Sequence, residues 1–236
     1  MNPMDASAIK RFKEAAAVSA AAQLQDGMVV GLGSGTTATL AVAAIGQRVL
    51  EGLKIVAIPT SQKTADQARL LNIPLSTLED YAAIDVTIDG ADEVEAGTLN
   101  LIKGGGGNLL REKIVAVASS RMIVVADERK VVSQLGRGVL PIEVVPFGWK
   151  TTAKRLEQVG AQPTLRLLPD GQIFVTDGGH YILDCTFASM RPPRLLQADL
   201  DPIVGVVEHG LFIGIASQAL VGGPTGVRIM DRNAGG

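Results

Sequence analysis

The sequence predicts an α/β protein with a Rossmann-like, mostly parallel sheet, helices on both faces, and a smaller inserted α+β domain. Short apolar segments alternate with helical segments through the first half of the chain. Hydrophobic residues make up 47% of the chain but aromatic residues only 3%, so the core is expected to be aliphatic, as buried parallel strands are. Glycine-rich or acidic stretches stand where several strands end, and open α/β sheets bind their ligands there.

The first half of the chain supplies the strands and helices of the main sheet. Ile9, Phe12 and Ala16 recur at helical spacing and predict a helix over residues 8–24, which Gly27 ends. The expected strands that follow are 28–31, 54–58, 85–88, 99–102 and 121–126. The expected helices between them are 36–49, 61–72 and 108–119.

The pattern changes after residue 133 to short strands separated by turns, typical of a compact α+β (ferredoxin-like) unit. Its expected elements are a helix over 149–160 and strands over 141–148, 164–168, 173–176 and 181–187. From Gly210 onward the chain returns to apolar strands. We therefore expect a catalytic domain of residues 1–133 and 208–236, and an inserted small domain of residues 134–207.

Composition excludes several classes of protein. A net charge of −2 does not resemble the basic footprint of a nucleic-acid binder, so we expect no nucleic-acid partner. The single cysteine, Cys185, cannot build a disulfide framework and indicates a reducing compartment, where we expect it to be a small buried hydrophobe. The N-terminal segment does not resemble a signal peptide, and no stretch suits a bilayer, so we expect no membrane partner. The expected location is cytoplasmic, or an organelle after loss of a transit peptide.

The first stretch of chemical interest is "GLGSGTT", residues 31–37, between a strand and a helix. It is not a dinucleotide fingerprint, because Thr36 replaces the third glycine, and no lysine follows to make a P-loop. Glycines, a helix N-terminus and the hydroxyls of Ser34, Thr36 and Thr37 could cradle a phosphate. An ordinary capped strand–helix turn is an equal alternative for this stretch alone.

The second stretch is "DGADE", where Asp89, Asp92 and Glu93 place three acids within five residues. Carboxylates gathered like this could hold sugar hydroxyls or move protons. Metal binding is a competing function, although the chain has only two histidines. A solvated acidic loop is the commoner outcome for such a stretch by itself.

The third and fourth stretches lie together in "KGGGGNLLREKI". Four consecutive glycines are costly in entropy, and Lys103 beside them could hold an anion or a developing oxyanion. On the helix that follows, Leu110, Ile114 and Val117 are expected to form the packing stripe. Glu112 would then lie on another face, either as a general base or as a surface glutamate in a salt bridge.

The motifs "GLGSGTT", "DGADE", "KGGGGNLLREKI" and "ADERK", in this order and spacing, resemble those of the ribose-5-phosphate isomerase A family. The resemblance extends over nearly the whole chain, including "LPIEVVPFG", "VTDGG…ILD" and "GLF…GGPTGV". It implies interconversion of ribose 5-phosphate and ribulose 5-phosphate through an enediolate, in the non-oxidative pentose phosphate pathway. It also implies no metal and no organic cofactor, and a homodimer or homotetramer.

The resemblance further implies roles for single residues. Glu112 matches the catalytic base, assisted by Asp89, Asp92 and Lys103. The residues expected to bind substrate are Lys13, Ser34, Gly35, Thr36, Thr37, Asp89, Gly90, Ala91, Asp92, Lys103, Gly104, Gly105, Gly106 and Lys130. The family more often has Thr and then Ser where this chain has Ser34 and Thr36, and more often asparagine at His180, a change that suggests no chemistry.

Isomerisation needs a base that moves a proton from C2 to C1, and groups that hold the enediolate charge. Glu112 and Lys103 are of the right types for these two tasks. Three alternatives remain at this stage: a non-enzymatic sugar-phosphate sensor, a CoA-transferase-like enzyme with a glutamate nucleophile, and an isomerase for a related phosphosugar. A sensor would not need Glu112 beside an intact acidic loop.

Overall fold

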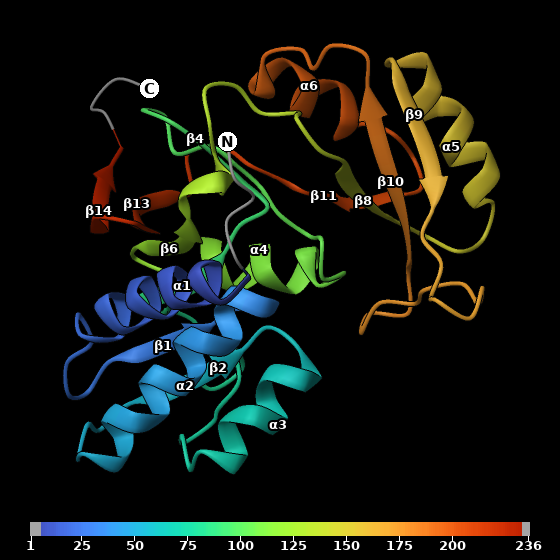
Figure 1. Cartoon of the computed structure of the whole chain (residues 1–236). Helices are drawn as coiled ribbons and strands as arrows, with labels where there is room; N and C mark the ends of the chain where they lie inside the picture. The colour runs from blue at the N-terminus through green and yellow to red at the C-terminus, as the bar shows by residue number, and fades with distance from the viewer. Residues whose placement is uncertain (1–5, 233–236) are drawn as a thin grey trace.

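A six-stranded sheet forms the centre of the computed structural model, which describes residues 6–232 (Figure 1). The strands, in spatial order, are β14 (Gly226–Asp231), β13 (Ala216–Gly223), β6 (Met122–Asp127), β3 (Val86–Gly90), β1 (Val29–Leu32) and β2 (Val56–Pro59). Every neighbouring pair is parallel except β13 and β14. The predicted α/β class with a mostly parallel sheet is confirmed.

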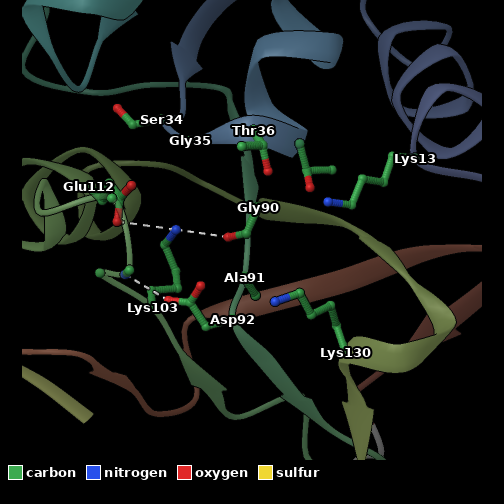
Figure 2. A pocket seen from close by; sticks show the side chains of 14 residues that line it. Lys13, Ser34, Gly35, Thr36, Gly90, Ala91, Asp92, Lys103, Glu112 and Lys130 are labelled. Carbon is green, nitrogen blue, oxygen red and sulfur yellow. Dashed lines mark hydrogen bonds and ion pairs between the residues drawn. The ribbon is translucent and has the colours of Figure 1, made fainter. Parts of the chain in front are cut away.

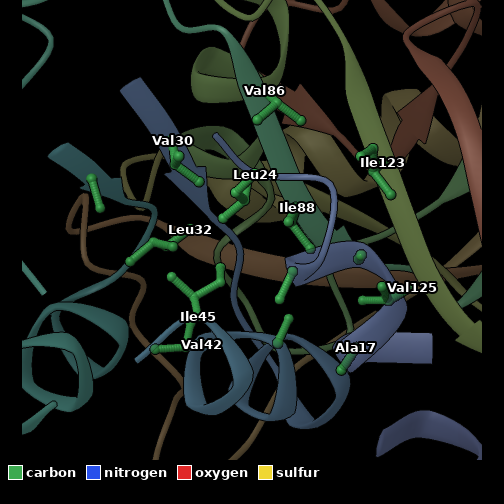
Figure 3. Close-up of a cluster of buried hydrophobic side chains, with 14 of the residues drawn as sticks. Ala17, Leu24, Val30, Leu32, Val42, Ile45, Val86, Ile88, Ile123 and Val125 are labelled. Atoms are coloured by element: carbon green, nitrogen blue, oxygen red, sulfur yellow. The ribbon is translucent and has the colours of Figure 1, made fainter. Parts of the chain in front are cut away.

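Helices α1 (Ala6–Ala21) and α2 (Thr36–Leu50) cover one face of this sheet (Figure 3). Because side chains alternate along a strand, Ile123 and Val125 of β6 point to this face. The buried side of α1 consists of alanines, which let the helix backbone approach the strands closely. None of the helices within residues 6–232 combines the length and apolarity that a bilayer span requires.

The opposite face packs against α4 (Leu109–Val117) and a second, smaller sheet. This sheet consists of β12 (Leu211–Phe212), β5 (Leu101–Ile102), β4 (Glu93–Glu95) and β7 (Val131–Val132). Helix α3 (Gln62–Leu70) follows β2 and packs against α2. The sequence did not indicate β4, because its two glutamates interrupt the apolar pattern of a buried strand.

The third sheet is antiparallel and lies to one side of the central sheet (Figure 1). Its strands, in spatial order, are β11 (Val206–His209), β8 (Leu140–Val144), β10 (Tyr181–Phe187) and β9 (Ala161–Leu165). Helices α5 (Trp149–Gln158) and α6 (Pro193–Leu200) pack on it around Leu156 and Leu196. Cys185 of β10 is fully buried in the same core, and burial raises the pKa of its thiol to about 12.

The predicted strand over residues 173–176 is wrong. The segment makes only two isolated bridges, Leu167 to Ile173 and Val175 to Tyr181. Tight turns flank it on both sides, and Gly171 and Gly179 adopt the positive φ angles that these turns require. The apolar residues between the turns are therefore too few to form a ladder of paired residues.

Gly222 of β13 allows α1 to approach the sheet closely. A Cβ atom built there would lie 1.9 Å from the main-chain oxygen of Phe12, which a side-chain rotation cannot relieve. Gly222→Ala should cost roughly 3 kcal/mol of overpacking, a fall in Tm of about 6–12 °C. Gly223→Ala is the matched control, because its Cβ would meet only the mobile end of Glu128. Equal Tm values for the two variants, measured by calorimetry, would contradict this account.

Candidate active site

A cavity of about 330 Å³ opens beyond the carboxyl ends of β1 and β3 (Figure 2). Its lining consists of Lys13, Ser34, Gly35, Thr36, Thr37, Gly90, Ala91, Asp92, Lys103, Gly104, Gly105, Gly106, Glu112 and Lys130. Every one of these is a site residue expected from the sequence. The remaining expected residue, Asp89, lies beneath the cavity wall with no exposed surface. The topology thus brings together stretches that are far apart in the chain.

The loop between β1 and α2 presents a helix N-terminus to the cavity. Gly35 is the N-cap of α2, with φ of +91°, and no side chain caps the first turn. The N–H groups at Thr36 and Thr37 therefore lack the usual side-chain acceptor and suit an anion. The capped-turn alternative does not fit this geometry.

The hydroxyl of Ser34 has a different position. It lies 2.6 Å from Oγ1 of Thr60 and is buried, while Thr64 donates to the carbonyl of Gly33 at 3.0 Å. These threonines stand at the end of β2 and in α3, and no motif pointed to them. They hold the loop from below, so the hydroxyl of Ser34 stabilises the loop in addition to lining the cavity.

Lys103 lies between two buried carboxylates. Its Nζ is 2.9 Å from Oδ2 of Asp89 and 3.2 Å from Oε2 of Glu112, and it donates to the carbonyl of Gly90 at 2.8 Å. None of the three side chains exposes more than 4% of its surface. Neither of these two carboxylate oxygens accepts a hydrogen bond from the described residues, so the charge of Lys103 compensates both. The other oxygen of Asp89, Oδ1, accepts hydrogen bonds from the N–H groups of Ser34 and Gly90.

Burial controls the protonation of this cluster. The pKa of Glu112 is raised to about 8 because burial, reinforced by the charge of Asp89, outweighs the opposing effect of Lys103. Burial also raises the pKa of Asp89, against Lys103 and the N–H groups of Gly90 and Ser34. For Lys103 the two carboxylates outweigh burial and raise its pKa, so it remains an ammonium ion. The carboxyl of Glu112 can therefore take up and release a proton near neutral pH.

The expected packing stripe of α4 is wrong. Ile114 and Val117 are 44% and 64% exposed. The buried face of the helix consists of Leu109, Glu112, Val115 and Ala116. Both faces show helical spacing, and the sequence offers no sign that a glutamate belongs to the inner one. Lys103 makes its burial tolerable, and the alternative of a surface glutamate is excluded.

The three acids of the "DGADE" stretch have separate surroundings. Asp92 faces the cavity and accepts a hydrogen bond from N of Gly105 at 2.8 Å. Glu93 points away and accepts from the N–H groups of Gly136 and Gly138 at 2.7 and 2.6 Å. Asp89 pairs with Lys103. The stretch is therefore not a solvated loop, and no group of three or more His, Cys, Asp or Glu residues in the described part of the chain could hold a metal.

Two lysines stand on the side of the cavity away from Glu112 (Figure 2). Lys13 comes from α1, and Lys130 from a short 3-10 helix, Glu128–Lys130. Asp127, buried at the end of β6, lies 3.8 Å from Lys13 and 2.7 Å from Nε of Arg129. Asp127 thus ties α1 to the carboxyl end of the sheet, a role that its place in "ADERK" did not reveal.

Phe212 and Lys113 support the cluster from behind, and although both lie in motifs quoted above, sequence reasoning assigned neither a role. Nζ of Lys103 lies 5.4 Å from the centre of the Phe212 ring, and Nζ of Lys113 lies 5.1 Å from it. Lys113 also donates to Oε1 of Glu208 at 2.6 Å and to the carbonyl of His209 at 2.7 Å. These contacts fix α4, and with it Glu112, against β11.

The site has the features of an acid–base enzyme: the buried carboxyl of Glu112 has a pKa raised to about 8, and Lys103 is in contact with it. Lys13 and Lys130, across a small cavity, suit small phosphorylated substrates. Comparison with known proteins identifies the family. Residues 56–226 match the family model of ribose 5-phosphate isomerase A (phosphoriboisomerase A). The chain belongs to this family, and its activity is the interconversion of ribose 5-phosphate and ribulose 5-phosphate, as the sequence predicted.

Individual relatives resemble the chain over nearly its whole length. Ribose-5-phosphate isomerase A of Synechococcus sp. (strain JA-3-3Ab) is 53% identical over 94% of this chain and 97% of its own. The structure of the isomerase from Methanocaldococcus jannaschii is 37% identical, with a TM-score of 0.90 over 94% of this chain and 99% of that one. A D-ribose-5-phosphate isomerase in complex with phospho-erythronic acid, also 37% identical, gives a TM-score of 0.91 over 95% and 99%. These matches favour the isomerase over the sensor.

The raised pKa of Glu112 predicts that Glu112→Gln stabilises the fold at alkaline pH. The folded state holds the proton up to about pH 8, whereas the ordinary value is 4.5. Stability is therefore lost as pH rises from 4.5 through 8, and glutamine avoids that loss. At about pH 9 the free energy of unfolding of Glu112→Gln should exceed that of the wild type by ~1 kcal/mol or more. Each kcal/mol corresponds to about 2–4 °C in Tm. The difference should vanish as the pH falls to the ordinary pKa of a glutamate. The exposed Glu79→Gln is the control, and a lower Tm for Glu112→Gln at every pH would contradict the prediction.

Proposed function

We propose that Glu112 is the base of the isomerisation and that Lys103 holds the negative charge of the enediolate. The observation that carries this proposal is the 3.2 Å contact between Oε2 of Glu112 and Nζ of Lys103 in a buried site. A base titrating near neutral pH combines a usable deprotonated fraction with proton-transfer driving force. An ammonium ion in a site of low exposure stabilises developing charge strongly.

The steps follow from the substrate's chemistry. Glu112 removes the proton from C2 of the open-chain aldose, and the electron pair forms the C1–C2 double bond while charge develops on O1. Lys103 stabilises that charge. The hydroxyl proton of O2 then passes to O1, and Glu112 returns its proton to C1, which leaves the carbonyl at C2. The base ends in the protonation state in which it began.

We further propose different tasks for the two aspartates. Asp92 lines the cavity and is half-buried, which supports direct contact with substrate hydroxyls and a part in ring opening. Asp89 is fully buried behind Lys103 and 2.9 Å from its Nζ, which supports a role in positioning that lysine. Of the two, only Asp92 has surface in the cavity with which to reach a ligand.

The phosphate is proposed to bind on the side of the cavity opposite Glu112. Lys13, Lys130 and the N-terminus of α2 at Thr36 and Thr37 supply positive charge and N–H donors there. This arrangement leaves the carbon chain to extend toward Lys103 and Glu112. The hydroxyls of Thr36 and Thr37 add further donors.

The decisive variant is Glu112→Gln, assayed for conversion of ribose 5-phosphate with EDTA present. Loss of the base should lower kcat by ~10²–10⁴-fold, while KM changes little because the phosphate contacts lie elsewhere. The wild type should keep its activity in EDTA. The exposed Glu79→Gln serves as the matched control and should be unchanged.

Two results would overturn the assignment. Near-normal turnover by Glu112→Gln would remove it as the base. Loss of wild-type activity in EDTA, restored by a divalent cation, would place a metal in the mechanism. Incubation with an acyl-CoA separates the remaining alternative, since a covalent adduct on Glu112 is expected only for a transferase.

Removal of a phosphate-side cation should affect binding more than chemistry. A charged hydrogen bond contributes about 1.5–3 kcal/mol, so Lys130→Ala should raise KM by roughly 10-fold or more and change kcat less. The exposed Lys154→Ala is the control. Steady-state kinetics decide the point, and a fall in kcat with unchanged KM would argue against this placement of the phosphate.

We also propose that residues 1–133 and 208–236 form the catalytic domain and residues 134–207 a small one. The buried cluster around Leu156, Leu183 and Leu196 supports this division. A homodimer or homotetramer and a cytoplasmic location remain proposals, supported by the family resemblance and by a single unpaired cysteine. Hydrogen exchange tests the domain division, and cell fractionation tests the location. Light scattering tests the oligomer, which a molar mass of one 24.6 kDa chain would exclude.

A further inference from the structure

Arg166, just beyond β9, reaches from the third sheet into the glycine loop of the active site. Its Nη1 donates to the carbonyl oxygens of Gly104 and Gly105 at 3.0 and 3.1 Å. On its other side, Nε donates to Oδ2 of Asp184 at 2.8 Å and Nη2 donates to Oδ1. The guanidinium thus joins a strand of the third sheet to two residues that line the catalytic cavity.

The same part of the chain supports the loop through an aromatic ring. The guanidinium of Arg166 lies 5.7 Å from the centre of the Phe174 ring. That ring packs so closely under Gly107 that a Cβ there would lie 2.3 Å from it. Arg166 and Phe174 therefore form one continuous surface beneath the loop.

The loop needs such support because its own sequence gives it little rigidity. Four glycines have more conformational freedom than any other four residues, and Gly104 and Gly107 adopt positive φ angles. On the cavity side, Asp92 accepts from N of Gly105. Arg166 holds the carbonyls on the other side, so the loop is fixed between two charged partners.

We propose that Arg166, oriented by Asp184, is a positioning residue for the isomerisation. By fixing the glycine loop it fixes Lys103, which begins the loop, against the site where charge develops. The proposal rests on the function proposed for Lys103. It also explains the aspartate at the end of "VTDGG…ILD", which the catalytic mechanism leaves without a role.

Arginine suits this task better than lysine does. The planar guanidinium presents donors in fixed directions, so it can pair with a carboxylate along one edge and reach two carbonyls along another. Lysine carries the same charge at one point and cannot do both. A lysine variant therefore separates charge from geometry.

The test compares Arg166→Met, Arg166→Lys and Asp184→Asn with Arg191→Met. Arg191 pairs with Asp199 in the same part of the chain and does not contact the loop, which makes it a matched control. Misplacement of the loop should lower kcat of Arg166→Met about 10-fold or more, with a much smaller change in KM. Arg166→Lys should be similarly impaired, and Asp184→Asn less so.

Three further measurements distinguish positioning from a general structural role. Added guanidinium ion should partly restore kcat of Arg166→Met and should leave kcat of Arg191→Met unchanged. Affinity for phospho-erythronic acid, which is bound by a relative, should weaken in parallel with kcat/KM. The double variant Arg166→Met/Asp184→Asn should be no slower than Arg166→Met, because the two act as one unit.

Wild-type kcat in Arg166→Met would overturn the proposal, even with a lowered Tm. If Arg166→Met does not fold, full activity in a folded Arg166→Lys would overturn it equally. Both variants retain Glu112 and Lys103, so kcat reports on the position of the loop and not on the loss of a catalytic group. An active Glu112→Gln variant, in contrast, would refute the base and leave the Arg166 measurement standing.

Discussion

The ion cluster of Lys103 with Asp89 and Glu112 is the interaction on which the site depends. One buried lysine lies against two buried carboxylates, and its loss would leave both acids without a compensating charge. The arrangement explains why a glutamate occupies the inner face of α4. It also explains why Phe212 and Lys113 lie behind the cluster, since they fix the elements that carry it.

Glycine makes the close approaches around this cluster possible. A Cβ at Gly33 would lie 2.1 Å from Oδ1 of Asp89, and one at Gly105 would lie 2.7 Å from Oδ1 of Asp92. The glycines of "GLGSGTT" and "KGGGG" therefore leave room for carboxylates as well as for substrate. Because these glycines have no side chain, the backbone contacts the carboxylates at the carboxyl ends of the strands directly.

The sequence could reveal those parts of the fold and site that depend on local pattern. Strand ends marked by Gly31–Thr37 and Asp89–Glu93 located the cavity, because parallel strands place their carboxyl ends together. The inner face of α4 was missed, because two faces fit the helical period and only Lys103, elsewhere in the chain, makes the polar one stable. Arg166 was missed for a similar reason: its loop partner lies about sixty residues earlier, at Gly104.

The packing of Phe12 against Gly222 has a consequence for the order in which the protein can fold during its synthesis. Helix α1 is synthesised before every other described element, yet β13, the strand it packs against at Gly222, is synthesised after all of them except β14. Strand β13 also completes the parallel sheet beside β6. A nascent chain can therefore form the third sheet before β13 exists. Lys13, in contrast, reaches its position in the catalytic cavity only once β13 has been made, so a chain interrupted before β13 lacks a complete cavity.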